Sequence, residues 1–158
     1  MLPDSVRHYL LEGLEATPFV LERLVVAISE RESNHRRDPE RFTIRKVVAH
    51  LADWEAIWLE RMVRMRWHES PRLQGYDPDE LAREHNYAGT VVVEQLERFR
   101  AGREDMLRML YDLEPEDWSR PAIHDEWGSL TISDLATLIL GHDSYHLRQV
   151  AEWRTAAA

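Results

Sequence analysis

The chain of 158 residues contains no cysteine. Disulfide bonds, a thiolate nucleophile and cysteine-bound zinc are therefore excluded together. A reaction that needs a thiol would have to take its sulfur from a separate small molecule. Cysteine usage gives no information on the redox compartment, because a chain without thiols is compatible with either environment.

Long apolar runs are missing as well. The longest strongly apolar stretch covers residues 135–140, whereas a transmembrane helix needs about 20 such residues. The N-terminal segment carries Asp4, Arg7 and Glu12, so it has no uncharged apolar core of signal-peptide length. We therefore expect a cytoplasmic protein that has no membrane partner.

Basic residues are too few to balance the acidic ones. The chain has 20 lysines and arginines against 29 aspartates and glutamates, which gives a formal net charge of -9. Proteins that bind nucleic acid usually display a basic stripe or patch, so we expect no direct nucleic-acid binding. A hydrophobic content of 44% indicates a globular chain, and the length suits one domain over residues 1–158.

Glycine is scarce, with 6 residues, and no segment shows the alternation that is typical of a strand. Apolar residues instead recur every three or four positions, which predicts four amphipathic helices. They cover approximately residues 4–32, 43–66, 89–113 and 131–153. Thr17-Pro18 interrupts the first helix, so we expect a kink there or a restart with Thr17 as N-cap.

The connection between the second and third helices is about twenty residues long and includes Pro71, Gly75 and Pro78. A hairpin between antiparallel helices needs far fewer residues. The length favours a crossover, with a short helix at residues 78–84, after which the second and third helices run parallel. The expected fold class is all-α, a four-helix bundle in up-down-down-up order.

Two histidines interrupt the apolar stripe of the last helix. The stripe runs through Leu135, Ile139 and Val150, and helical spacing places His142 and His146 at its missing positions. Residues four apart are neighbours on one helix surface. The pair can supply two nitrogens of a three-histidine metal site, or the rings can be core residues that bond to protein oxygens.

A third histidine, His50, borders the apolar stripe of the second helix, one turn from Val47 and Trp54. It lies about 10 Å into that helix, and the His142/His146 pair lies about 16 Å from the end of the last helix. These two depths along the bundle axis agree to about one helical turn if the two helices are antiparallel, as the predicted order requires. Three neutral imidazoles leave open positions on a divalent cation, which is typical of a catalytic site.

Three stretches resemble the DinB-like superfamily of small metal-binding four-helix proteins, which includes the bacillithiol and mycothiol S-transferases. They are residues 14–18, residues 47–53 with Glu55 following, and the motif His142-Asp143-Ser144-Tyr145-His146-Leu147-Arg148-Gln149. The similarity in layout covers nearly the whole chain. It implies a divalent metal bound by His50, His142 and His146, with nickel or zinc favoured over iron or manganese, and often a homodimer.

The resemblance says more about the metal site than about the reaction that the site performs. The family includes thiol transferases, a thiol-dependent isomerase and suspected hydrolases, besides members with no known activity. The isomerase branch places a glutamate at one ligand position. This chain has histidine at all three positions, so the isomerase activity is not carried across.

Four further residues are candidates near the site. Asp53 lies one turn beyond His50 and is a catalytic candidate, as a supporting partner or an acid/base group, with a solvated carboxylate as the alternative. Tyr145 is the second catalytic candidate. Trp54 and Gln149 are candidates for the substrate pocket. Core packing is the alternative for Trp54, and orientation of a histidine is the alternative for Tyr145 and Gln149.

Two function classes follow. The first is a divalent-metal-dependent enzyme that activates water, as a hydrolase, or an external low-molecular-weight thiol, as a thiol S-transferase, for a small-molecule substrate. The second is a non-catalytic metal-binding or stress-response protein on the same scaffold. An open coordination position beside a cavity distinguishes the two, because only the enzyme needs it.

Overall fold

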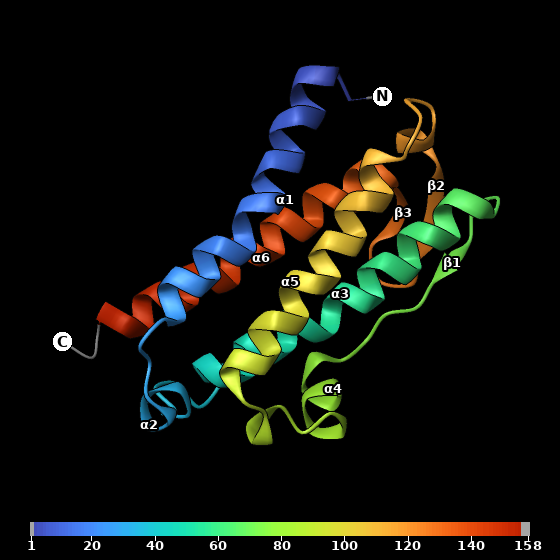
Figure 1. Ribbon diagram of the computed structural model, residues 1–158. Helices are drawn as coiled ribbons and strands as arrows, with labels where there is room; N and C mark the ends of the chain where they lie inside the picture. Colours follow the sequence, from blue (N-terminus) through green and yellow to red (C-terminus); the bar gives the residue numbers. More distant parts are fainter. Residues whose placement is uncertain (1, 156–158) are drawn as a thin grey trace.

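The computed structural model describes residues 2–155, so residue 1 and residues 156–158 of the predicted domain lie outside the described part. Four long helices form a bundle (Figure 1). They are α1 (Asp4–Val25), α3 (Ile44–Trp67), α5 (Val92–Tyr111) and α6 (Ile132–Thr155). Helices α3 and α5 run in one direction and α1 and α6 in the other (Figure 1), which confirms the predicted up-down-down-up bundle.

The helices begin where the sequence provides capping side chains. Thr43 Oγ1 accepts a hydrogen bond from the Lys46 N–H at 3.3 Å, at the start of α3. At the start of α6, the Thr131 N–H donates to Asp134 Oδ2 at 2.8 Å, and the Asp134 N–H donates to Thr131 Oγ1 at 3.2 Å. Such caps satisfy backbone N–H groups that have no partner inside the helix.

Thr17-Pro18 does not restart the first helix. Helix α1 continues through Pro18 and has Pro3 as its N-cap, so of the two outcomes expected there, the restart with Thr17 as N-cap is wrong. Proline has no N–H to bond to the Leu14 carbonyl, one turn earlier. That carbonyl instead accepts from Arg103 Nη1 at 2.8 Å, so the helix can run on without an unsatisfied acceptor.

The connections contain more regular structure than the sequence predicted. The short helices are α2 (Glu30–Ser33), α4 (Pro78–Glu84), η1 (Tyr87–Gly89) and η2 (Asp117–Ser119). The strands are β1 (Arg72–Leu73), β2 (Pro121–His124) and β3 (Gly128–Thr131). Strand β2 pairs parallel with β1 and antiparallel with β3, and this small sheet lies beside the C-terminal end of α3 (Figure 1). Helix α4 occupies the position predicted for it.

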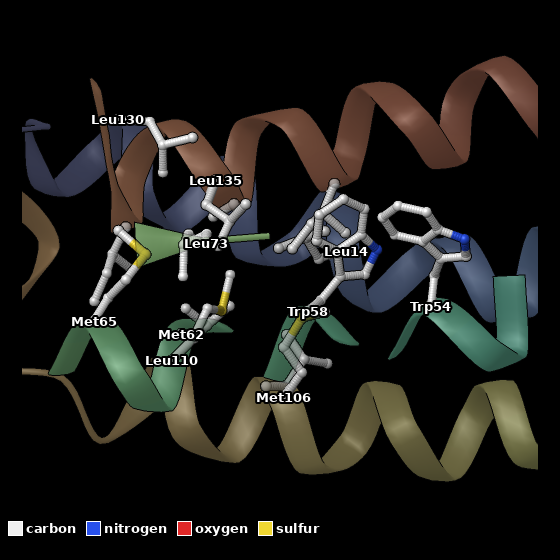
Figure 2. Packing of buried hydrophobic residues seen from close by; sticks show 14 of the residues in the cluster. Leu14, Trp54, Trp58, Met62, Met65, Leu73, Met106, Leu110, Leu130 and Leu135 are labelled. Atoms are coloured by element: carbon white, nitrogen blue, oxygen red, sulfur yellow. The ribbon is translucent and has the colours of Figure 1, made fainter. Parts of the chain in front are cut away.

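All four long helices contribute to the core. Leu14 of α1, Trp58 and Met62 of α3, Met106 of α5 and Leu135 of α6 are each at most 1% exposed (Figure 2). The stripes predicted from periodicity therefore meet at the centre of the bundle. None of the described helices combines the length and apolar composition required to cross a membrane.

Candidate metal centre

Three histidines come together between α3 and α6. His50 is on α3, and His142 and His146 are on consecutive turns of α6. The Nε2 atoms of His50 and His142 are 2.9 Å apart, and one nitrogen from each of the three rings lies within 4.8 Å of the others. His50 and His146 are buried, and His142 is partly exposed. The antiparallel helices thus bring the three residues to one level of the bundle.

The surroundings keep two of these rings neutral. Burial, together with the nearby His142, lowers the pKa of His146 to about 3. Burial also lowers the pKa of His50 well below its ordinary value of 6.5, with a further contribution from His142 and His146. A neutral imidazole keeps a free lone pair on one nitrogen, and this is the form that binds a metal ion.

The donor set fits a divalent cation. Two ligand nitrogens of a tetrahedral site, each about 2.0–2.1 Å from the metal, are about 3.3 Å apart, which falls between the 2.9 Å and 4.8 Å found here. The Nδ1 atoms of His50, His142 and His146 are buried and have no hydrogen-bond partner among the described residues. Buried ring nitrogens without a partner cost free energy, and a cation bound by the facing nitrogens would offset part of the cost of burying the cluster, although it would not satisfy the Nδ1 atoms themselves.

A cavity of about 400 Å³ opens beside the histidines, and all three of them line it. Five aromatic side chains form much of the remaining wall: Phe42, Trp54, Tyr76, Trp127 and Tyr145. The volume lies in the range of small-molecule sites. The three histidines therefore border open space, unlike the ligands of a closed structural metal site.

Three of the four further candidates line this cavity: Trp54, Tyr145 and Gln149. Tyr145 is 46% exposed, and its ring centre is 4.9 Å from that of His146. Gln149 is 1% exposed, and its side-chain amide donates to the Phe42 carbonyl at 2.8 Å. Trp54 lies at the end of the core cluster next to Trp58, with the ring centres 4.6 Å apart (Figure 2).

Asp53 does not line the cavity. Its Oδ2 accepts from the Tyr87 hydroxyl at 2.7 Å and lies 2.7 Å from His85 Nδ1, while its Oδ1 is 3.6 Å from Arg98 Nη2. Tyr87 is 1% exposed, and its ring centre is 6.3 Å from that of His50. Asp53 therefore contacts Tyr87, His85 and Arg98, and none of the three clustered histidines.

Sequence reasoning missed a buried charged residue, Arg103, at the centre of the bundle. Arg103 is 1% exposed. Its Nη2 lies 2.7 Å from Glu55 Oε1 and 2.7 Å from Asp143 Oδ2. Burial acts to raise the pKa of Asp143, but the adjacent His142 and the Arg103 charge outweigh it and hold that pKa below its ordinary value. The sequence offered one indication of this buried ion pair: Asp143 directly follows His142, one of the clustered histidines.

The fold and the site define a class of protein: a small four-helix bundle whose three clustered histidines suit a metal ion beside an open cavity. The chain belongs to the DinB superfamily, because the model of that family matches residues 14–150. This confirms the family resemblance that the histidine motifs carry.

Two relatives are similar over most of the chain. A protein of Oceanobacillus iheyensis with the name "Putative metal-dependent hydrolase OB0782" is 26% identical over 140 residues, which cover 89% of this chain and 81% of that protein. YfiT from Bacillus subtilis, described as "a probable metal-dependent hydrolase with an unusual four-helix bundle topology", has a TM-score of 0.93 at 18% identity. The match covers 99% of this chain and 90% of that chain, and at this identity it shows the shared fold.

Proposed function

We propose that the protein is a metal-dependent hydrolase acting on a small molecule, with His50, His142 and His146 as ligands of a divalent cation. The observation that carries the proposal is the cluster of three histidine nitrogens within 4.8 Å of one another on the wall of a cavity. The names of the two similar proteins, both of which refer to metal-dependent hydrolysis, support this reaction class.

The bound cation would lower the pKa of a coordinated water or thiol toward neutrality. The protein's own residues have separate tasks. Tyr145, partly exposed at the cavity, is placed to give a proton to a leaving group. Gln149, held by the Phe42 carbonyl, and Trp54 shape the substrate pocket. Asp53 fixes the hydroxyl of Tyr87 and so limits the movement of the ring that packs near His50.

The proposal extends to the identity of the metal ion, the thiol cofactor and the oligomeric state. Nickel or zinc is the preferred ion, because imidazole ligands suit both of these metals, with iron or manganese as the other choices. An S-transferase reaction would need an external low-molecular-weight thiol, since the chain has no cysteine. A homodimer in the cytoplasm, without direct nucleic-acid binding, completes the proposal. The competing function is metal binding without catalysis on the same scaffold.

Elemental analysis of the as-purified protein tests the metal site. We expect about one divalent ion per chain, and His50→Ala should weaken its binding on the order of 100-fold or more, because one of three nitrogen ligands is lost. His35→Ala is the matched control, since His35 is exposed and does not line the cavity. Protein without stoichiometric metal, or unchanged metal content in a folded His50→Ala variant, would contradict the proposal.

Activity panels on the loaded protein separate the function classes. Hydrolysis of small esters or amides that depends on the metal and on His142 supports the hydrolase assignment. Activity only in the presence of an added thiol, with transfer of its sulfur to the substrate, supports the S-transferase. Stoichiometric metal without either activity favours the non-catalytic alternative.

A further inference from the structure

Aromatic rings dominate the wall of the cavity beside the histidines. One of them, Trp127, lies between β2 and β3, is 42% exposed and lines the cavity. A tryptophan on a short connection between strands would ordinarily be free to change its orientation. The surroundings of Trp127 instead hold its ring in place from two directions.

The first support is His124, which stacks on Trp127. The two ring centres are 3.9 Å apart, and the ring planes differ by 9°. His124 is 2% exposed, and its Nδ1 accepts from the Glu126 N–H at 3.1 Å and the Trp127 N–H at 3.4 Å. The histidine therefore fixes both the backbone of the connection and one face of the indole ring.

The second support is Arg61, which is 1% exposed. Its Nη2 donates to the Gln74 carbonyl at 2.5 Å. Its guanidinium carbon lies 5.5 Å from the ring centre of Trp54 and 5.6 Å from those of Tyr76 and Trp127. Contacts of a desolvated cation with ring faces are attractive at these distances. One buried cation thus fixes three rings of the cavity wall, which come from α3 and from two separate connections.

We propose that the substrate of this site carries a planar aromatic group, which packs against Trp127 and Trp54. The inference rests on the proposed function, because it takes the histidine cavity as the substrate site. Rings that are already fixed lose little freedom on binding. A flat aromatic ligand gains both apolar burial and ring–ring contact there, whereas a saturated ring of similar size gains only the burial. Trp127 is then a specificity-determining residue.

The test uses two neutral probes, naphthamide and its fully saturated decalin counterpart, and the full-length protein as purified. Titration calorimetry gives the two Kd values. We expect naphthamide to bind about 3- to 10-fold more tightly than the saturated probe. The chain has 6 tryptophans, each with one indole N–H, and naphthamide should shift the NMR signal of Trp127. Equal affinities for the two probes, or no binding of either, would overturn the inference.

Two variants locate the effect. Trp127→Leu keeps an apolar side chain but removes the ring, so naphthamide should lose much of its roughly 3- to 10-fold advantage over the saturated probe, whose own affinity should be little affected. Trp67→Leu is the matched control, because Trp67 is 70% exposed at the end of α3 and does not line the cavity. A folded Trp127→Leu variant that binds naphthamide like the unaltered protein would refute the role of this residue.

Metal content, measured on the same samples, separates the proposed hydrolase function from the proposed specificity for an aromatic group. A preference for naphthamide in protein that holds no metal would refute the proposed hydrolase and leave the aromatic specificity intact. Stoichiometric metal without a preference between the probes would refute the aromatic specificity alone.

Discussion

Replacing Arg103 with methionine would show whether one buried guanidinium holds the four long helices together. Arg103 bonds to Glu55 of α3 at 2.7 and 3.0 Å and lies 2.7 Å from Asp143 of α6. It also donates to the Leu14 carbonyl of α1 at 2.8 Å. Methionine retains much of the buried length of the side chain, so Arg103→Met removes mainly the charge and the hydrogen bonds.

The expected loss follows from the burial of the two carboxylates. Glu55 and Asp143 are 2% and 1% exposed, and Arg103→Met leaves them without a cation. Breaking a buried ion pair by removing one partner costs about 3–5 kcal/mol. For a domain of this size, each 1 kcal/mol shifts Tm by about 2–4 °C. We therefore expect Tm to fall by about 6–20 °C.

The pH dependence separates loss of charge from loss of packing. Burial raises the pKa of the Glu55 carboxyl above its ordinary value, and the loss of Arg103, which opposes that shift, raises it further. A carboxyl with a raised pKa destabilises the folded state when it is ionised, and the penalty disappears as the pH falls and the group is protonated. The deficit of Arg103→Met should therefore shrink between about pH 8 and pH 5, whereas a packing defect would be independent of pH.

Urea unfolding followed by circular dichroism at several pH values measures the deficit. Arg108→Met is the matched control: this residue is on the same helix, its side chain is 76% exposed, and it pairs with Asp105 at the surface. We expect the control to change the free energy of unfolding by less than about 0.5 kcal/mol. A loss below about 1 kcal/mol for Arg103→Met, or a deficit that does not vary with pH, would refute the reasoning.

Two more predictions concern helix glycines and acid. Gly102→Ala should lower the free energy of unfolding by about 1–3 kcal/mol, measured by thermal unfolding, because a Cβ at this position would lie 2.6 Å from Glu55 Cβ. Gly141→Ala, which meets nothing within 4 Å, should be neutral or stabilising by up to about 1 kcal/mol. In metal-free protein, the free energy of unfolding measured in urea should fall by up to about 2–3 kcal/mol for each pH unit below pH 6.5. The lowered pKa values of His50 and His146 keep both rings neutral in the folded chain, whereas the unfolded chain binds protons at both. Stability that does not change with acid would contradict this.

The bundle was predictable because each long helix buries one continuous stripe. Trp58 and Met62, one turn apart on α3, are 1% and 0% exposed, as periodicity requires. The strands were not predictable. They are two to four residues long: β1 pairs with β2 across a large separation in sequence, with Arg72 opposite Ile123, and β3 pairs with β2 in a short hairpin. Such pairing leaves no periodic pattern in either segment.

The cluster of His50, His142 and His146 has a signal within one helix, whereas the Arg103 cluster, formed by Arg103, Glu55 and Asp143, does not. His142 and His146 stand out because they replace hydrophobes within one helix, a signal contained in a few residues. Arg103 looks like any charged residue of an amphipathic helix, and most such residues are solvated. Its burial results from carboxylates on two other helices, and the sequence marks only one of them, Asp143, by its position directly after His142.

The Arg103 cluster and the histidine site are mechanically connected through Asp143. Its Oδ2 accepts from Thr17 Oγ1 at 2.9 Å and lies 2.7 Å from Arg103 Nη2, while its Oδ1 is 3.8 Å from Nδ1 of the adjacent His142. A carboxylate held by two other helices fixes the position of α6 along the bundle, and hence the level at which His142 faces His50. The site geometry should therefore respond to changes at Arg103, although that residue does not line the cavity.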